Sequence, residues 1–384
     1  MAEFRNFNYS MRQVVQAGDA LREELVWSED HRDELLEIFT IANLWRESHL
    51  YPMYRMRHEM SGKMRRKKLA GIAAARLKRM PSIRKKLRRI SSKLNQLQDL
   101  GGCRAILPSI ADANSLLDAY RNGAKHEFMR EKNYIANPKI GGYRSHHMIF
   151  RYVGNSEDEV YNGRRIELQI RTRLQHTWGT AVEAVGLLRN EDMKAGEGNP
   201  DWLKLFDLMS AELALAERCP EPPHLPSRKE RVAEIIELNK KLNALSTLEN
   251  FRHAVRFAMT YTHAPGDAPK CFRIEYNHAA TRVTVSPHSR PVTGVEEYEK
   301  AELEDSIAGD GNIDTVFVDA DKLEDLQAAY PNYFGDVQLF CRNLESITQG
   351  KTAKEYTLPP QATVPLPPKE TPDLSWFRRR GRWS

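Results

Sequence analysis

The sequence predicts an α/β fold with a mixed, largely antiparallel sheet flanked by helices, followed by a smaller helical and α/β C-terminal domain. Short apolar runs of strand length alternate with longer amphipathic segments of helical period. Two strand-like runs, residues 144–152 and 164–172, are joined by a polar loop, which favours an antiparallel hairpin. The segment CPEPPHLPS (residues 219–227) then interrupts the pattern, so we expect the first domain boundary in or near it.

Length and composition are those of an ordinary globular protein. The chain has 384 residues, of which 41% are hydrophobic and 29% are charged, which allows two or three domains. No apolar run approaches about 18 residues, and the N-terminal residues lack the apolar core of a signal peptide, so we expect a cytoplasmic protein without a membrane span. The four cysteines are far apart and form no CxxC pair, which argues against a zinc knuckle or a disulfide framework.

Positive charge is concentrated in one segment. Fourteen Lys and Arg residues, from Lys63 to Lys93, lie between Glu59 and Asp99 without any acidic residue among them. The net charge of the whole chain is only +6, so the remainder of the chain is net acidic. We expect this segment to bind a polyanion, either nucleotide phosphates or nucleic acid. The alternative is a solvated helix face, although no carboxylate is interleaved to support such a helix by ion pairs.

The N-terminal part is expected to be helical. Residues 10–60 have a helical period, and Ser28 is a candidate N-cap. One face of this region collects apolar side chains: Leu35, Ile38, Phe39, Ala42 and Trp45. The basic segment 64–95 is expected to continue as helix, with a break at Pro81.

The middle of the chain is expected to alternate strands and helices. GCRAIL (102–107) predicts a short strand, and Ser109 begins a helix with a capping-box-like start. After the hairpin, Thr172 is expected to cap a helix, and a further helix is expected over residues 201–217.

The C-terminal part is expected to contain a small α/β unit. Two helices are expected after the Pro-rich break, to about Thr260. The expected strands are 271–276, 281–286 and 314–319, followed by helices near 321–329 and 335–347. The tail from residue 350 holds six prolines between Pro359 and Pro372, so it is expected to be extended or disordered.

Polar side chains with recognisable chemistry lie on the predicted strands or directly before them. In IELQIRT (166–172), the apolar side chains alternate with Glu167, Gln169 and Arg171, so these three are expected on one face. Asp99 precedes two glycines and the strand that carries Arg104. If the two strands are neighbours, Asp99 and Glu167 lie close enough to share a divalent cation, and two carboxylates plus phosphate oxygens are a usual Mg²⁺ site. A plain turn-capping role for Asp99 is the alternative.

The loop NPKIGGYRSHHMIF (137–150) adds the remaining groups of a phosphoryl-transfer site. Lys139 and Arg144 are placed for phosphates, Tyr143 is placed to stack on a base, and His147 lies further along the strand. Cations for the leaving charge, a metal pair and an aromatic platform together indicate phosphoryl transfer on a sheet.

Four segments, taken in order, resemble the synthetase domain of the RelA/SpoT family. They are RLKRMPSIRKKL (76–87), QDLGGCRAI (98–106), KNYIANPKIGGYRSHH (132–147) and IELQIRT (166–172). The resemblance implies a nucleotidyltransferase-like synthetase domain that moves the β,γ-pyrophosphate of ATP to a ribose 3′-hydroxyl and releases AMP. It covers roughly residues 40–190, and it divides the chain into N-terminal helices (1–60), a synthetase domain (61–218), a regulatory C-terminal domain (228–348) and a Pro-rich basic tail (349–384).

The resemblance also implies a role for each matching residue. Arg76 and Arg104 would sandwich the adenine of ATP, and Lys78 and Lys86 would hold its phosphates. Asp99 would bind Mg²⁺, with Glu167 as a second metal ligand or as the base on the attacking hydroxyl. The acceptor-binding residues would be Lys139, Tyr143, Arg144, His147 and Gln169.

Two features depart from the family pattern. Asn133 stands where the family usually has Asp, which puts the identity of the acceptor in question. Only 75 residues precede Arg76, fewer than the ~200 of the family's hydrolase domain, so no hydrolase activity is expected.

AAYPNYF (328–334), in the C-terminal part, resembles an inhibitory element. Fused toxin–antitoxin members of the family, the CapRel-like proteins, carry a Tyr-x-x-Tyr element that blocks the ATP site, and Tyr330 and Tyr333 match it. Aromatic rings can occupy the slot between two arginines by cation–π contact. In such proteins the acceptor is the 3′-terminal adenosine of tRNA, and a phage protein relieves the inhibition. The alternative reading of the two tyrosines is a helix end packed on a core.

Three functions therefore remain open. The first is a self-inhibited pyrophosphotransferase that modifies tRNA, a translation-blocking toxin in phage defence. The second is a (p)ppGpp synthetase that uses GDP or GTP and has a regulatory C-terminal part. The third is a catalytically silent nucleotide-binding module, which the presence of Asp99, Tyr143 and Glu167 disfavours.

Overall fold

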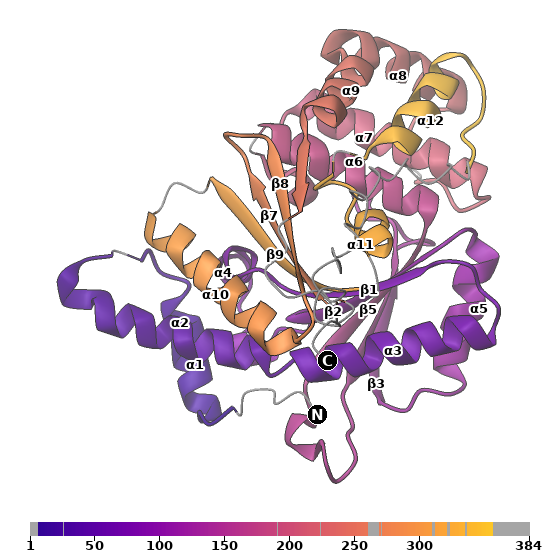
Figure 1. The fold of residues 1–384 in the computed structure, drawn as a ribbon. Helices are drawn as coiled ribbons and strands as arrows, with labels where there is room; N and C mark the ends of the chain where they lie inside the picture. The colour runs from indigo at the N-terminus through magenta and orange to yellow at the C-terminus, as the bar shows by residue number, and fades with distance from the viewer. Residues whose placement is uncertain are drawn as a thin grey trace, which may run out of the picture.

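The computed structural model describes residues 7–355, apart from residues 26, 190, 223, 260–268, 270, 309–311, 321–322 and 335. Within these residues nine strands form one sheet in the order β3-β4-β5-β2-β1-β9-β7-β8-β6 (Figure 1). The strands are β1 (Ile72–Leu77), β2 (Gly101–Leu107), β3 (Glu127–Asn133), β4 (His146–Arg151), β5 (Arg165–Thr172), β6 (Arg256–Met259), β7 (Cys271–Asn277), β8 (Arg282–His288) and β9 (Ile313–Asp319). The α-helices are α1 (Met11–Ala20), α2 (Arg32–Glu47), α3 (Leu50–Arg66), α4 (Met80–Arg89), α5 (Ile110–Arg121), α6 (Arg173–Arg189), α7 (Pro200–Ala216), α8 (Arg228–Leu242), α9 (Ala244–Ala254), α10 (Pro291–Ala308), α11 (Leu323–Ala329) and α12 (Gln338–Thr348).

The sheet is mixed and largely antiparallel. Only the pairs β2–β5 and β6–β8 are parallel, and the other neighbouring strands run antiparallel. The predicted fold class is therefore confirmed, as is the hairpin of β4 and β5. Strands β2 and β5 are also neighbours, which is the condition on which the expected pairing of Asp99 with Glu167 depended. None of the helices in the described part of the chain is long and apolar enough to cross a membrane.

The C-terminal strands extend the same sheet. Strand β9 pairs with β1, Ala75 opposite Asp319 and Arg76 opposite Val318, and β9 also pairs with β7. Segment 219–227 lies in the connection between α7 and α8. The division into domains at residues 61–218 and 228–348 stays a prediction, but the backbone hydrogen bonds run through both parts without a gap at β1.

Apolar packing also joins the two parts of the chain. Helices α6, α7, α8, α9 and α12 gather at one end of the molecule (Figure 1). There Phe206 of α7 lies 5.8 Å from Phe340 of α12, measured between ring centroids, and Trp178 of α6 packs edge-on against Phe206. Burial of such large side chains is a main source of stability, so α11 and α12 are anchored to the helices that follow β5.

The predicted basic helix over residues 64–95, with its break at Pro81, is wrong in its centre. Helix α3 ends at Arg66, and IAAARL forms β1 before α4 begins at Met80. Alanine favours helix in isolation, but β1 has strand partners on both sides, which satisfy its backbone groups. A glycine is needed just before it, since a Cβ at Gly71 would lie 2.5 Å from the carbonyl oxygen of Ile106.

Several other expectations need correction. Ser28 contacts Nδ1 of His31 and does not cap α2, which starts at Arg32 after a 3₁₀ turn. The second predicted C-terminal helix ends at Ala254 and is followed by β6, while Thr260 lies outside the described residues. Strand β3 and helix α10 were not predicted, because their charged residues obscure the apolar period. The predicted disordered tail beyond residue 355 also lies outside the described residues.

Candidate functional site

The candidate site lies on the polar face of β1, β2 and β5. The three apolar side chains of β5 between Arg165 and Arg171 are fully buried on the opposite face. Side chains alternate along a strand, so Glu167, Gln169 and Arg171 project from the site face, as their period of two predicted.

Strand pairing places these side chains in two rows. In the first row Arg76 is opposite Gly102, which is opposite Glu167. Because glycine has no side chain, no side chain of β2 separates Arg76 from Glu167, and the floor of the site is open there. In the second row Arg104 is opposite Gln169. The adjacency of β2 and β5 therefore assembles a site from segments far apart in sequence.

A cavity of about 800 Å³ opens over this face, within the usual range for small-molecule sites. Ten predicted site residues line it: Arg76, Lys78, Lys86, Asp99, Arg104, Lys139, Tyr143, His147, Glu167 and Gln169. Of the other predicted site residues, Arg144, Tyr330 and Tyr333 are not among its described lining residues.

Asp99 is held between two lysines. Its Oδ2 accepts hydrogen bonds from Lys78 Nζ at 3.0 Å and from Lys86 Nζ at 2.8 Å. Burial alone would raise the pKa of this carboxyl, but the two ammonium groups outweigh burial and lower the pKa below its usual value. The carboxylate is therefore charged at neutral pH and keeps two phosphate-binding cations beside the cavity.

Glu167 belongs to a hydrogen-bonded chain of four side chains. Its Oε1 lies 2.8 Å from Nδ1 of His147, whose Nε2 lies 2.7 Å from the hydroxyl of Tyr143. Its Oε2 accepts a hydrogen bond from Nε2 of Gln169 at 2.7 Å. Burial opposes the charged form of Glu167, and so does the nearby Asp99, yet the hydrogen bonds from His147 and Gln169 hold its pKa below the ordinary value.

Two observations fit a divalent cation at this point. Oδ1 of Asp99 is buried and has no hydrogen-bond partner among the described residues. Asp99 and Glu167 line the same cavity, and the charge of Asp99 opposes ionisation of Glu167. The described residues contain no group of three or more His, Cys, Asp or Glu side chains suited to a metal, so most ligands of a Mg²⁺ ion here would be phosphate oxygens and water, as is usual for this ion.

Aromatic and cationic side chains form the side of the cavity next to β3. Lys139 Nζ lies 4.6 Å from the ring centroid of Tyr134 and 5.1 Å from that of Tyr143, both within cation–π distance. Tyr134 packs edge-on against His147. The rings of Tyr134 and Tyr143 therefore flank a lysine at the cavity wall.

Arg144 does not reach the cavity, so its predicted phosphate contact is wrong. Its guanidinium donates hydrogen bonds to the carbonyl oxygens of Ile135 and Pro220, each at 2.9 Å, and to Ser210 Oγ at 3.3 Å. Neighbouring side chains in extended backbone point to opposite sides, and Tyr143 takes the cavity side. Arg144 instead ties the loop to α7 and to the segment that follows it.

Buried arginines with unpaired Nε atoms gather on the side of the cavity where ATP is expected to bind. Nε of Arg104 and Nε of Arg171 are both buried without a hydrogen-bond partner among the described residues. Burial and the neighbouring Arg104 lower the pKa of Arg171 well below its usual value. Buried guanidinium groups this close repel one another, so this part of the cavity favours an anionic ligand.

Tyr330 lies against two arginines of the cavity, Arg76 and Arg104. Its ring centroid is 5.6 Å from Cζ of Arg76 and 5.3 Å from Cζ of Arg104, and Arg104 Nη1 donates a hydrogen bond to the carbonyl oxygen of Ala329 at 3.1 Å. Tyr333 is also buried, and burial raises the pKa of its hydroxyl, with Arg79 as the strongest nearby charge. Only Tyr330, therefore, makes the expected contact with both arginines.

Sequence reasoning missed several cavity residues. Arg171 had been recognised on the polar face of β5 but was not assigned to the site. Arg130 and Lys132 line the cavity from β3, a strand that was not predicted, and Lys194 lines it from a 3₁₀ turn after α6. Lys194 comes after Glu191, Asp192 and Met193, and no local pattern in this segment could have identified it as a cavity residue.

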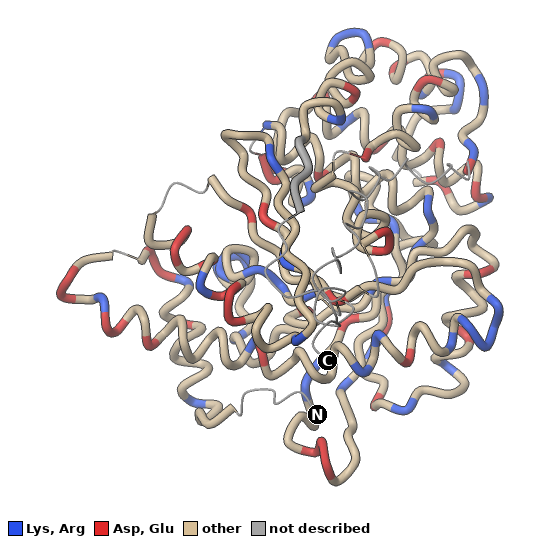
Figure 2. Tube along the Cα trace, in the orientation of Figure 1, with Lys and Arg blue, Asp and Glu red and all other residues tan. Residues whose placement is uncertain are grey.

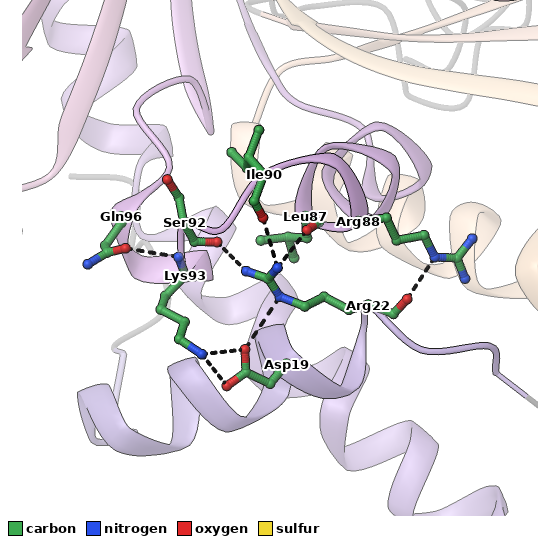
Figure 3. Close-up of polar contacts among 8 residues, drawn as sticks. All are labelled: Asp19, Arg22, Leu87, Arg88, Ile90, Ser92, Lys93 and Gln96. Carbon is green, nitrogen blue, oxygen red and sulfur yellow. Dashed lines mark hydrogen bonds and ion pairs between the residues drawn. The ribbon is translucent and has the colours of Figure 1, made fainter.

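Helix α4, which carries Lys86, is held at its C-terminal end by α1. Arg22 donates hydrogen bonds to the carbonyl oxygens of Leu87 and Ile90, each at 2.8 Å, and also to that of Ser92 (Figure 3). The carbonyl of Leu87, in the last turn of α4, is one that the end of a helix leaves without an intrahelical partner. Arg88 in return donates to the carbonyl oxygen of Arg22 at 2.8 Å. Two helix C-termini, both negative dipole ends, are thus joined through arginines.

The outer face of α4 is partly neutralised. Acidic and basic residues are interspersed over most of the described chain (Figure 2), whereas the charged residues of α4 are all basic. Lys85 lies 2.5 Å from Asp192, and Arg89 lies 3.4 Å from the same carboxylate. The loop after α6 therefore lies beside the ATP-binding helix predicted from the sequence.

Comparison with known proteins identifies the region that forms the cavity. Residues 75–187 match the family model described as the region found in RelA / SpoT proteins. We call these residues the RelA/SpoT-type region, after the proteins to which they are similar. It runs from β1 into α6 and contains Lys78, Asp99, Tyr143 and Glu167. The predicted resemblance is confirmed for this RelA/SpoT-type region, while the likeness of the whole chain to CapRel-like proteins stays a prediction.

Two curated relatives of the RelA/SpoT-type region come from Bacillus subtilis and are named GTP pyrophosphokinase. YwaC is 27% identical over 125 residues, which are 31% of this chain and 59% of YwaC. YjbM is 30% identical over 111 residues, which are 27% of this chain and 51% of YjbM. The chain therefore spans little more than half the length of these relatives. Among solved structures, small alarmone synthetase 1 from Bacillus subtilis bound to pppGpp is 21% identical, with 44% of this chain and 89% of that chain covered and a TM-score of 0.39.

Proposed function

We propose that the protein is an ATP-dependent pyrophosphotransferase of the RelA/SpoT synthetase type. The observation that carries this proposal is Asp99, held between Lys78 and Lys86 and next to Glu167, on the floor of a cavity rich in arginine. The names of the relatives support the same reaction class. A carboxylate pair beside clustered cations is the arrangement that transfer from a nucleoside triphosphate needs.

In the proposed reaction the acceptor's 3′-oxygen attacks the β-phosphorus of ATP. A bond forms between that oxygen and the β-phosphorus, the bond from the β-phosphorus to the oxygen bridging to the α-phosphorus breaks, and AMP leaves with that oxygen. Lys78 and Lys86 bind the phosphate chain and offset the charge that develops on it. Asp99 and Glu167 would hold Mg²⁺, which supplies further charge neutralisation at the phosphates.

Glu167 is also the proposed base for the 3′-hydroxyl. Its lowered pKa means that the carboxylate is ready to accept a proton at neutral pH. The hydrogen bonds from His147 and Gln169 orient its two oxygens. Tyr143 lies at the far end of this row of hydrogen-bonded side chains, where its ring can contact the base of the acceptor.

For the acceptor, we propose the 3′-terminal adenosine of tRNA, which makes the protein a translation-blocking toxin in phage defence. Basic residues on β3 and in the following loop, among them Arg130 and Lys132, support an acceptor with a phosphate backbone. GDP or GTP is the alternative, with an alarmone product, and the names of the relatives favour it.

The Asn133 substitution carries less weight for the acceptor than its position in the motif suggested. Oδ1 of Asn133 accepts hydrogen bonds from the backbone N–H groups of Ile135 and Ala136, so the side chain caps a turn. Aspartate makes the same turn contacts.

Self-inhibition by the C-terminal part is the second element of the proposal. Tyr330 lies against Arg76 and Arg104, the two arginines that would otherwise hold the adenine. An adenine ring and the tyrosine ring cannot occupy this space together. A phage protein that binds the C-terminal part and withdraws Tyr330 would then start the reaction.

The test uses the full chain and γ-labelled ATP. A chain cut near residue 220 is unsuitable, because it would uncover the edge of β1 and remove Asp319, the partner of the buried Arg57 at 2.6 Å. GDP, GTP and tRNA are offered separately to wild type and to Tyr330→Ala, with Tyr330→Ala/Glu167→Gln as the inactive control. Label on tRNA supports the toxin, and label only on guanine nucleotide supports the alarmone synthetase. Absence of transfer to all three would refute the proposed enzyme.

A further inference from the structure

Helix α4 begins without a capping group of its own. The preceding residue, Arg79, has extended backbone and makes no side-chain hydrogen bond to the helix, and the first turn contains no acidic residue. Pro81 in that turn has no N–H to offer. Helix N-termini normally receive an acceptor or a negative charge at this point, so the sequence of α4 leaves the N–H of Met80 to be satisfied from elsewhere.

The missing acceptor comes from α10 in the C-terminal part of the chain. Oε1 of Glu302 accepts a hydrogen bond from the backbone N–H of Met80 at 3.0 Å, although the two residues are 222 positions apart. The carboxylate is itself held in place: Tyr298 donates its hydroxyl to Oε1 at 2.7 Å, and Arg46 Nη1 donates to Oε2 at 2.6 Å. Arg46 is fully buried, so this charge pair is fixed inside the protein.

The same contacts fix the start of α4 relative to the candidate site. Arg46 also approaches the carbonyl oxygen of Lys78 at 3.4 Å, and Arg79 forms an ion pair with Asp314 of β9. Lys78 lies two residues before Met80, and Lys86 lies within α4. Both lysines bind Asp99, so a change in the position of α4 would move Lys86 directly.

We propose that Glu302 is a positioning residue for the nucleotide site, acting as the N-cap that α4 lacks. By holding the start of α4, it sets Lys86 against Asp99. The C-terminal part of the chain then has two opposite effects: Tyr330 obstructs the cavity, while Glu302 keeps its phosphate-binding helix in place. The effect on nucleotide binding rests on the proposed function, but the effect on α4 does not.

The test measures two quantities in a Tyr330→Ala background, so that the tyrosine does not obscure nucleotide binding. The first is the hydrogen-exchange rate of the amides of α4, and the second is the affinity for a non-hydrolysable ATP analogue. Glu302→Ala is expected to speed exchange in α4 and to weaken the analogue about fivefold to tenfold, the equivalent of a lost N-cap. Glu304→Gln is the matched control on α10, since Glu304 is exposed and lies 3.9 Å from Lys300, and it is expected to change neither quantity more than about twofold.

A rescue variant separates positioning from general destabilisation. Ser82→Glu adds a carboxylate to the first turn of α4, where it can serve the uncapped N-terminus. In the Glu302→Ala chain it is expected to slow exchange in α4 again and to recover at least half of the lost affinity on a logarithmic scale.

Two results would overturn the inference: unchanged exchange in α4 in the Glu302→Ala chain, or a loss that Ser82→Glu does not reverse. If no variant, including Tyr330→Ala alone, binds the ATP analogue, the proposed function fails instead. Exchange in α4 then decides the inference by itself.

Discussion

Replacement of Tyr330 by alanine should raise the affinity of the protein for ATP. The ring of Tyr330 faces the guanidinium groups of Arg76 and Arg104 at 5.6 and 5.3 Å, and Tyr330 is only 2% exposed. Under the proposed function, the ring takes the place of the adenine between these two arginines. ATP would then bind only in the fraction of molecules from which the ring is withdrawn, and its apparent affinity would be reduced by that fraction.

The magnitude follows from the two contacts. A partly desolvated cation–π contact contributes about 1 kcal/mol, so two of them stabilise the closed position by about 2 kcal/mol. Since 1.36 kcal/mol corresponds to a factor of ten, Tyr330→Ala should strengthen ATP binding about 30-fold. Tyr330→Phe keeps the ring and should stay within about threefold of wild type, because the ring face makes both contacts with the arginines.

Titration calorimetry with a non-hydrolysable ATP analogue measures this directly on the full chain. Tyr152→Ala is the matched control, since it removes another almost fully buried tyrosine whose hydroxyl bonds Asp158 at 2.8 Å. It should lower thermal stability without strengthening ATP binding. If Tyr330→Ala binds the analogue no more tightly than wild type, or if Tyr330→Phe binds it as tightly as Tyr330→Ala, the inhibitory role of the ring is refuted.

Three further predictions concern the fold that supports the site. Burial lowers the pKa of His49 to about 3, so between pH 6.5, its ordinary pKa, and pH 3 the unfolded chain binds a proton that the folded chain does not. The free energy of unfolding should therefore fall by about 1.4 kcal/mol per pH unit as the pH is lowered through this window. Urea titrations of His49→Gln should lack this part of the pH dependence. Asp319→Ala removes a carboxylate that lies 2.6 Å from the buried Arg57. Chemical denaturation should show a free energy of unfolding lower by about 3 to 5 kcal/mol. A loss below about 1 kcal/mol would contradict the importance of this ion pair. Gly142 has φ +91°, and a Cβ there would lie 2.6 Å from Cβ of Ser210, so Gly142→Ala should lower the free energy of unfolding by about 2 kcal/mol. It should also raise the KM for the acceptor more than the KM for ATP. An equal rise in both KM values would argue against an acceptor role for this loop.

Local pattern was sufficient for much of the site. The alternation in IELQIRT assigned Glu167 and Gln169 to one face of a strand, because side chains in a strand alternate whatever the strand pairs with. The meeting of Asp99 with Glu167 was expected only if their strands are neighbours, and β2 and β5 do lie side by side. Arg144 shows the limit of such reasoning, since composition marked it as a phosphate ligand and only its packing against α7 revealed otherwise.

The sequence by itself determined the fold class, the basic segment and ten of the residues that line the cavity, because periodicity, charge and motif spacing are local properties of the chain. The tertiary structure alone decided that the alanine-rich segment is β1, since its two strand partners satisfy a backbone that would otherwise favour helix. It also decided that Tyr330, and not Tyr333, faces Arg76 and Arg104, and that α4 receives its N-cap from Glu302. Except for the pairing of β1 with β2, these contacts join residues more than 200 positions apart, and no local pattern encodes which distant group satisfies a buried charge or a free backbone N–H.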